Sequence, residues 1–206
     1  MKLIEIMEEK ELFGSWQTGP DGKYLPNIFT DKAHPHTYVQ NFYEKEFEKY
    51  KDKDISLLEI GVMSGGCFLL WKEYFSNPKN LLGVDVTDRF LHPECREIEG
   101  VDWKFGNGYD KEFSDTLDTF DIIIDDGPHT LESQIKCIEL YLSKLNKGGV
   151  FVIEDVAQSQ YFDKLITTAQ NIAEDDDSDV EYEVECLDFR GPTTPPDDMM
   201  FIVRKV

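Results

Sequence analysis

The sequence predicts a doubly wound α/β fold whose sheet is mostly parallel, with an antiparallel edge at its C-terminal end and a helical cap at its N-terminal end. Three observations lead to this prediction. Short apolar runs alternate with amphipathic stretches from about residue 54 onward, the runs lack polar alternation, and acidic residues stand at their carboxyl ends. Parallel strands that are buried on both faces have this pattern.

The spacing of apolar residues predicts where the cap and the core of the fold lie. Between residues 38 and 50, aromatic and aliphatic side chains recur on one face of a helix. We therefore expect residues 1–53 to cap a core formed by 54–206, all within one domain. The predicted strands are 55–60, 80–85, 101–105, 120–125 and 149–154, and the predicted helices are 67–75, 131–145 (stopped by Gly148-Gly149) and 157–172.

The last part of the chain predicts the antiparallel edge. Residues 174–179 are nearly all acidic and are expected to form a solvated loop. Residues 180–189 alternate like a strand, a Pro-rich loop follows at 191–198, and residues 199–203 read as the last strand. Two strands joined by a loop after a parallel sheet indicate an antiparallel pair.

The charge balance excludes two classes of partner. The chain of 206 residues carries 42 Asp and Glu against 21 Lys and Arg, a formal net charge of −21, yet 40% of its residues are hydrophobic. Its 14 Phe, 9 Tyr and 3 Trp are too many for a disordered acidic chain. Nucleic acids and anionic membranes are bound by clusters of Lys and Arg, which this sequence lacks. We expect neither as a partner.

The N-terminus and the cysteines predict a cytoplasmic protein. Residues 1–13 interleave apolar residues with Glu, unlike a signal peptide, and no apolar run approaches the roughly 20 residues of a membrane span. The four cysteines are far apart and form no CxxC pair, so free thiols in a reducing compartment are expected.

A glycine-rich turn follows the first predicted strand. The segment Glu59-Ile-Gly61-Val-Met63-Ser64-Gly65 leads into a helix, whose N-terminus offers unpaired N–H groups. A dinucleotide fingerprint requires glycine where Met63 stands, because the pyrophosphate touches the backbone there. The turn therefore suits a carboxylate better than a pyrophosphate. The alternative is an ordinary structural turn between a strand and a helix.

Two further positions describe a nucleoside site. Asp85 closes the second strand, where an acidic side chain can hold a ribose diol, although it can equally cap a helix. Asn107 follows the third strand, where its amide can meet a purine. With the glycine turn, these positions predict a site for a nucleoside that carries a carboxylate.

Acidic residues also follow two strands that we expect to be neighbours. Asp125 and Asp126 end one strand, and Glu154 and Asp155 end the other. The carboxylates of Asp126, Glu154 and Asp155 would repel one another unless a cation bridged them, and an all-oxygen set suits Mg²⁺, Mn²⁺ or Ca²⁺. His129 is close enough to take a proton from a hydroxyl bound there. The alternatives are acids that cap helices and a turn histidine bonded to the backbone.

Four short motifs carry a resemblance to a known family. They are Thr30-Asp31-Lys32 followed by Tyr38, the Leu58-Glu-Ile-Gly61 turn, Asp125-Asp-Gly-Pro-His129, and Ile153-Glu-Asp155. Over residues 28–206 the chain resembles the class I S-adenosylmethionine-dependent methyltransferases, and among them the metal-dependent sugar O-methyltransferases of the macrocin, mycinamicin and rhamnosyl group. Pro128 stands where that family usually has Ser, and it should stiffen the turn.

The resemblance implies a Rossmann-like methyltransferase sheet and an O-methyltransferase. The methyl donor would be S-adenosylmethionine, and the acceptor a hydroxyl of a deoxyhexose such as rhamnose in a glycan or glycosylated product. It implies that Asp126, Glu154 and Asp155 bind Mg²⁺ (or Mn²⁺ or Ca²⁺) and that His129 is the general base. The residues expected at the cofactor are Thr30, Lys32, Glu59, Gly61, Ser64, Gly65, Asp85, Asn107 and Asp125.

Contacts with the acceptor are expected from His36 and Tyr38 in the cap and from Arg190 in the Pro-rich loop, with purely structural or solvated roles as the alternatives. Two other functions stay open at this point: a catechol or phenolic O-methyltransferase, and an accessory protein that binds S-adenosylmethionine without transferring methyl. The expected partner is a small-molecule or glycan acceptor. A homo-oligomer and a place within a larger glycan-synthesising enzyme both stay open.

Overall fold

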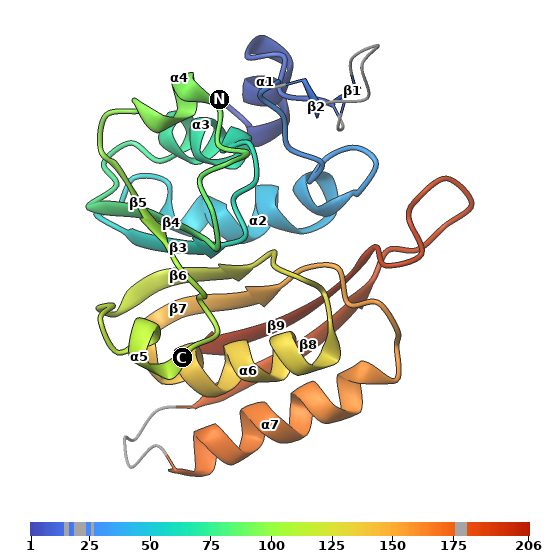
Figure 1. Cartoon of the computed structure of the whole chain (residues 1–206). Coiled ribbons are helices and arrows are strands. Elements are labelled where there is room, and N and C mark those ends of the chain that lie inside the picture. The colour runs from blue at the N-terminus through green and yellow to red at the C-terminus, as the bar shows by residue number, and fades with distance from the viewer. Residues whose placement is uncertain (15–16, 19–23, 26, 176–180) are drawn as a thin grey trace.

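A seven-stranded sheet runs through the middle of the molecule in the order β5-β4-β3-β6-β7-β9-β8 (Figure 1). The computed structural model describes residues 1–14, 17–18, 24–25, 27–175 and 181–206. The strands are β3 Ser56–Ile60, β4 Asn80–Asp85, β5 Val101–Phe105, β6 Phe120–Asp125, β7 Leu145–Ile153, β8 Tyr182–Asp188 and β9 Met199–Lys205. The first five are parallel, and β9 is antiparallel to both β7 and β8. The predicted sheet and its antiparallel C-terminal edge are confirmed.

The order of the strands creates the crevice that holds the site. From β3 the chain passes to β4 and β5 on one side, and then crosses to β6 and β7 on the other. Ligands of doubly wound sheets bind at such a reversal, outside the carboxyl ends of the strands. The ends of β3, β6 and β7 lie at one level, because Ile60 pairs with Asp125 and Asp125 pairs with Ile153. The residues that follow these three strands therefore emerge side by side.

Helices cover both faces of the sheet (Figure 1). One face packs against α1 Leu3–Glu9, the helical segment 39–50 and α3 Gly66–Tyr74. That segment comprises a π-helix Val39–Tyr43, α2 Glu44–Glu46 and a 3₁₀ turn Phe47–Tyr50. The other face packs against α5 Lys111–Ser114, α6 Leu131–Tyr141 and α7 Tyr161–Asp175. The remaining elements are the short strands β1 Gln17–Thr18 and β2 Tyr24–Leu25, the short helix α4 Pro93–Arg96 and a 3₁₀ turn at Leu142–Lys144.

The cap packs on the sheet through an aromatic cluster. Tyr43 and Phe47 contact Trp71 of α3 with ring centroids 5.5 Å and 5.3 Å away, and all three side chains are fully buried. Edge-on aromatic contacts of this kind add to the stability that burial provides. The helix expected at 38–50 is therefore present, and its apolar face lies inward. The expectation that 1–206 is one domain stays a prediction.

Two predicted helices have different limits in the structure. The stripe predicted over 131–145 ends in a 3₁₀ turn, Leu142–Lys144, and Leu145 begins β7 instead. Leu145 pairs with Phe120 in the sheet, so Gly148 and Gly149 lie inside a strand and do not stop the helix. Likewise α7 begins at Tyr161 and not at residue 157. It also includes Glu174 and Asp175 of the expected acidic loop, while residues 176–180 lie outside the described residues.

All four cysteines are free thiols, as predicted, and three of them are buried. Among the described residues, no helix has both the length and the apolar character that crossing a membrane would require.

Candidate active site

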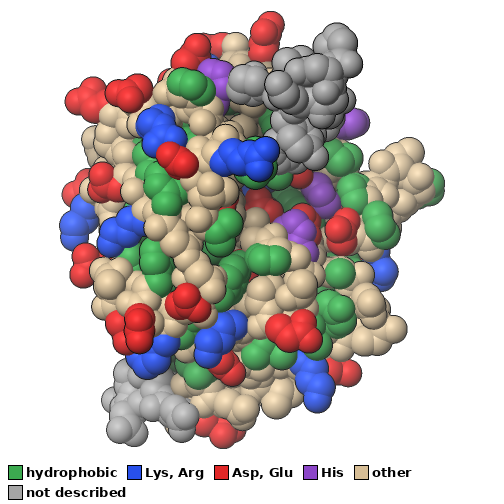
Figure 2. Space-filling model, in the orientation of Figure 1, with side chains coloured by type: hydrophobic (Ala, Val, Ile, Leu, Met, Phe, Trp, Pro, Cys, Tyr) green, Lys and Arg blue, Asp and Glu red, His purple; other side chains and the backbone are tan. Residues whose placement is uncertain are grey.

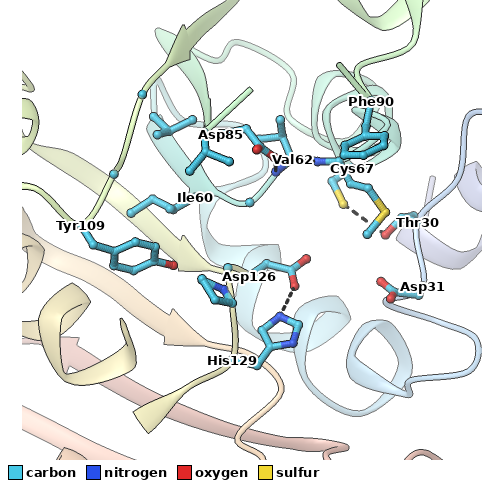
Figure 3. A pocket seen from close by; sticks show the side chains of 18 of the residues that line it. Thr30, Asp31, Ile60, Val62, Cys67, Asp85, Phe90, Tyr109, Asp126 and His129 are labelled. Carbon is cyan, nitrogen blue, oxygen red and sulfur yellow. Dashed lines mark hydrogen bonds and ion pairs between the residues drawn. The ribbon is translucent and has the colours of Figure 1, made fainter. Parts of the chain in front are cut away.

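A cavity of about 330 Å³ opens at the carboxyl ends of β3, β4 and β6 (Figure 3). Its wall is formed by the glycine turn, by the turn after β6, and by residues 29–31 of the cap. It contains three aspartates, Asp31, Asp85 and Asp126, and among the described residues neither Lys nor Arg lines it. Small-molecule sites have volumes of roughly 300–1,000 Å³. The cavity is large enough for such a ligand, and its charge favours a cationic or neutral one.

The glycine turn packs directly on the segment after β6. Gly61 has φ +90°, and a Cβ atom there would lie 1.9 Å from the backbone oxygen of Asp126. Asp85 lines the cavity and also orders the turn, because its Oδ2 accepts hydrogen bonds from the N–H groups of Val62 and Met63 at 3.1 Å and 3.3 Å. Two N–H donors of the turn are thus bound by a side chain of the protein itself.

We expect Gly61→Ala to destabilise the fold by at least about 2 kcal/mol, since it adds a backbone clash to an unfavourable conformation. Gly148→Ala is the matched control, because Gly148 has φ +80° but no atom within 4 Å of the added Cβ. The control should cost only about 1 kcal/mol. Urea denaturation of both variants measures the difference. Equal losses would mean that the turn does not pack against Asp126 as described.

Thr30, Gly61 and Asp85 line the cavity, as a cofactor role requires, but several other residues predicted at the cofactor do not. The Ser64 hydroxyl donates to the carbonyl of Phe29 at 3.0 Å, so it ties the glycine turn to the cap. Gly65 packs against the side chains of Leu91 and Cys95. The Asn107 amide is exposed and donates to Asp110 at 2.9 Å. None of these three residues is among those that line the cavity.

Asp125 lies behind the cavity, where Tyr109 covers it. The Tyr109 hydroxyl donates a hydrogen bond to Asp125 Oδ1, and burial raises the pKa of this carboxyl to about 7. Tyr109 itself lines the cavity, and sequence reasoning missed it. The one available signal was its position two residues after Asn107, in the turn that follows a parallel strand.

The turns after β6 and β7 bring together Asp126, His129 and Asp155. One ligand atom from each lies within 4.8 Å of the other two. His129 Nε2 is 3.3 Å from Asp126 Oδ1 and 3.5 Å from Asp155 Oδ2. His129 and Asp155 have φ +56° and +52°, a left-handed conformation that non-glycine residues rarely adopt. Where they do adopt it, the residue is often part of a functional site. Figure 2 shows histidine and acidic side chains together in a hollow of this face.

Asp126, His129 and Asp155, which we call the acidic group, alter one another's pKa values. Burial lowers the pKa of His129, but its hydrogen bond to Asp126 and the nearby charge of Asp155 outweigh burial and raise the pKa to about 9. Burial, with the charge of Asp126, raises the pKa of Asp155 to about 6. Negative charge that is concentrated in this way attracts a cation.

Glu154 was predicted beside these acids as a metal ligand, but its side chain is turned inward and is only 2% exposed. Its two carboxylate oxygens accept hydrogen bonds from the Tyr43 hydroxyl and the Lys32 ammonium. Lys32 was predicted at the cofactor, yet it is fully buried and does not line the cavity. Glu59, also predicted there, is fully buried, where its Oε2 accepts from Trp71 Nε1 at 2.6 Å. Long-range contacts with the cap turn Glu154 inward, whereas Glu59 is held by Trp71 of α3.

The residues suggested for the acceptor lie in different places. Tyr38 is buried and donates to Asp155 Oδ1 at 2.6 Å, so it orients that carboxylate. His36 stacks on Tyr38 at 4.9 Å, and its Nδ1 is 3.4 Å from both Asp155 and Asp198. Arg190 lies on the exposed loop between β8 and β9, and its guanidinium donates hydrogen bonds to Asp188 at the end of β8. Only His36 and Tyr38 contact the acidic group.

Comparison with known proteins shows which proteins the chain is related to. No protein-family model matches the chain. It is 30% identical over 155 residues to the 8-demethyl-8-alpha-L-rhamnosyl tetracenomycin-C 2'-O-methyltransferase of Streptomyces olivaceus, a match that covers 68% of this chain and 40% of that protein. The chain is a class I methyltransferase homologue, related to the sugar O-methyltransferases. It is also 29% identical over 160 residues to the mycinamicin VI 2''-O-methyltransferase of Micromonospora griseorubida, with 72% of this chain and 39% of that protein covered.

A solved structure agrees with this class I methyltransferase fold. The MycE methyltransferase of the mycinamycin biosynthetic pathway, in complex with Mg and SAH, superimposes with a TM-score of 0.68 at 20% identity, covering 100% of this chain and 55% of that one. The chain spans about two fifths of the length of the two curated sugar O-methyltransferases.

Proposed function

We propose that the chain transfers a methyl group from S-adenosylmethionine to a hydroxyl of a sugar, with the help of a divalent cation. The observation that carries the proposal is the position of Asp126, His129 and Asp155, which lie close together, with Asp126 and His129 in the wall of the cavity that the glycine turn also lines. The names of the homologous sugar O-methyltransferases support the reaction, and the MycE complex with Mg and SAH supports both ligands.

The cavity fits S-adenosylmethionine in shape and charge. Gly61 lines the cavity, and Asp85 stands at the end of β4, where ribose hydroxyls are commonly held. The aspartates of the wall suit a sulfonium cation, and the aromatic side chains of Phe90 and Tyr109 offer apolar surface. When bound, S-adenosylmethionine would supply the methyl group in an electrophilic form.

The acidic group fits Mg²⁺ or Mn²⁺. Mg²⁺ is usually bound by one or two carboxylates and keeps its other positions for water or substrate. Asp126 Oδ1 and Asp155 Oδ2 both lie close to His129 Nε2 and are the atoms that would hold the ion. When bound, the cation would stabilise the negative charge that develops on the acceptor hydroxyl.

His129 is the group of the chain that would take the proton of the acceptor, because a cation bound beside it would offset the negative charges that raise the pKa of its imidazole. Its side chain is one-third exposed, and its Nε2 lies beside the acidic group. Asp126 orients the imidazole through its hydrogen bond, and Tyr38 orients Asp155. Asp31 faces Asp126 and His129 across the cavity (Figure 3), so the acceptor would lie among three acidic side chains. A neutral sugar suits this charge better than an anionic one.

The test is a methyl-transfer assay with the complete chain, S-adenosylmethionine and Mg²⁺. The acceptors are a panel of rhamnosides and other deoxyhexosides, together with catechol. We expect methylation of a deoxyhexoside, loss of at least about 90% of turnover in EDTA, and recovery on adding Mg²⁺ in excess. Methylation of catechol alone would support the phenolic alternative. Cofactor binding without transfer to any acceptor would support an accessory role, and turnover that EDTA never affects would exclude the metal.

A further inference from the structure

A buried glutamine on α6 lies beside the turn that carries Glu154 and Asp155. Gln134 is only 1% exposed, and it stands one turn before Ile138 on the face of α6 that packs on the sheet. An amide is costly to bury at such a position unless it forms hydrogen bonds. The Gln134 side chain forms two, because its Nε2 donates to the backbone carbonyl of Glu154 at 3.2 Å and to that of Asp155 at 3.3 Å.

These two hydrogen bonds fix the orientation of the Gln134 amide. Both come from its NH₂ end, whereas Oε1 is buried and has no hydrogen-bond partner among the described residues. Turning the amide over would place Oε1 against two carbonyl oxygens, none of which can donate a proton. The position therefore uses the donors of the side chain. An apolar residue of the same size would fill the same space without them.

Gln134 connects the two turns that hold the acidic group. Its helix, α6, begins directly after His129, where the side chain of Thr130 caps the helix. The carbonyl at the other end of the contact belongs to Asp155, whose φ of +52° persists only where neighbouring groups support it. From the cap, the Tyr38 hydroxyl bonds both the N–H and the carboxylate of Asp155. The backbone of Asp155 is thus held by the cap on one side and by α6 on the other.

We propose that Gln134 is a positioning residue that holds the backbone of Asp155, and with it the place of the Asp155 carboxylate beside His129. This inference rests on the proposed function. Asp155 Oδ2 lies 3.5 Å from His129 Nε2, and the contact of Gln134 with the turn keeps these atoms together. Gln134 does not line the cavity, so it acts only through the turn. Its loss should change the acidic group and leave the binding of S-adenosylmethionine intact.

The first test compares Gln134→Met with the wild type in two titrations that need no acceptor. Met has about the size of Gln but no N–H donor. Affinity for Mn²⁺, followed by electron paramagnetic resonance of the free ion, should fall by about tenfold or more, the usual effect of losing a contact behind a metal site. Affinity for S-adenosylmethionine should stay within about twofold. Turnover at saturating S-adenosylmethionine should fall by about 10–100-fold.

Ile138→Val is the matched control, because Ile138 is fully buried one turn further along α6 and its replacement removes only packing. It should leave both affinities and turnover unchanged. A folded Gln134→Met that behaves as Ile138→Val does would overturn the inference. So would a variant that loses affinity for Mn²⁺ and for S-adenosylmethionine to the same extent, since that is the effect of a general disturbance of the fold.

A second measurement uses the wild type alone and does not depend on the folding of a variant. Exchange of the Gln134 side-chain NH₂ protons with D₂O, followed by nuclear magnetic resonance, should be at least about tenfold slower than that of Gln158, which is exposed. Exchange as fast as that of Gln158 would overturn the inference. Failure of the wild type to bind Mn²⁺, or to methylate any sugar, would instead contradict the proposed function.

Discussion

Replacing Asp126 by asparagine is expected to abolish metal-dependent methyl transfer. Asn keeps the size of the side chain and its hydrogen bond to His129, but it removes one of the two carboxylates that would bind the cation. A bound cation contributes several kcal/mol of charge stabilisation to such a reaction, so turnover should fall by about 10³-fold or more. Affinity for Mn²⁺ should fall in parallel, since a principal ligand is lost.

The measurements are initial rates at saturating S-adenosylmethionine and titration with Mn²⁺. Asp115→Asn is a suitable control, because Asp115 is an exposed aspartate paired with Lys111 on the surface and does not line the cavity. It should leave both quantities unchanged. Asp126→Asn that still responds to Mg²⁺ as the wild type does would contradict the assignment of this residue.

Replacing His129 by glutamine should lower turnover by about 10²–10⁴-fold, the usual contribution of a positioned general base. Gln can keep a hydrogen bond to Asp126, but it cannot accept the proton of a hydroxyl. Affinities for S-adenosylmethionine and Mn²⁺ should stay within about threefold of the wild type, because Asp126 and Asp155 remain. Single-turnover rates, together with separate binding titrations, test these expectations.

The binding titration distinguishes the two roles that the geometry of His129 allows. Its Nε2 lies within the group that can hold a metal, so the imidazole is placed to act as a base or as a ligand. A loss of Mn²⁺ affinity as large as the loss of turnover would identify it as a ligand. His92→Gln is the matched control, since His92 caps α4 and does not line the cavity. It should leave turnover and both affinities unchanged.

Most of the fold could be predicted because its strands are buried on both faces. Continuous apolar runs such as residues 120–125 have few other interpretations, and their limits agree with β6 as observed. The error at the end of α6 has a clear cause. Leu145 continues the helical stripe in sequence, but its pairing with Phe120 places it in the sheet. A local period cannot detect a partner that lies 25 residues away.

The candidate site could be predicted best where a functional residue ends a strand or directly follows one. Gly61, Asp85 and Asp126 are of this kind, and all three line the cavity. Asp31 and Tyr109 line it too, but they lie in irregular segments whose path depends on the packing of the cap and of α5. No period in the sequence indicates where such side chains point.

By itself, the sequence determined the class of the fold and the end of the sheet at which acidic residues gather. Hydrophobic runs specify buried strands, and the carboxyl ends of parallel strands meet at one edge. Only the tertiary structure decided which carboxylates face the cavity. Asp126 lines the cavity and Asp155 keeps one oxygen toward His129, while Lys32 and Tyr43, more than 100 residues earlier in the chain, turn Glu154 inward. The physical reason is that a carboxylate in a crowded acidic site turns toward its nearest proton donor or cation, and here the cap supplies both.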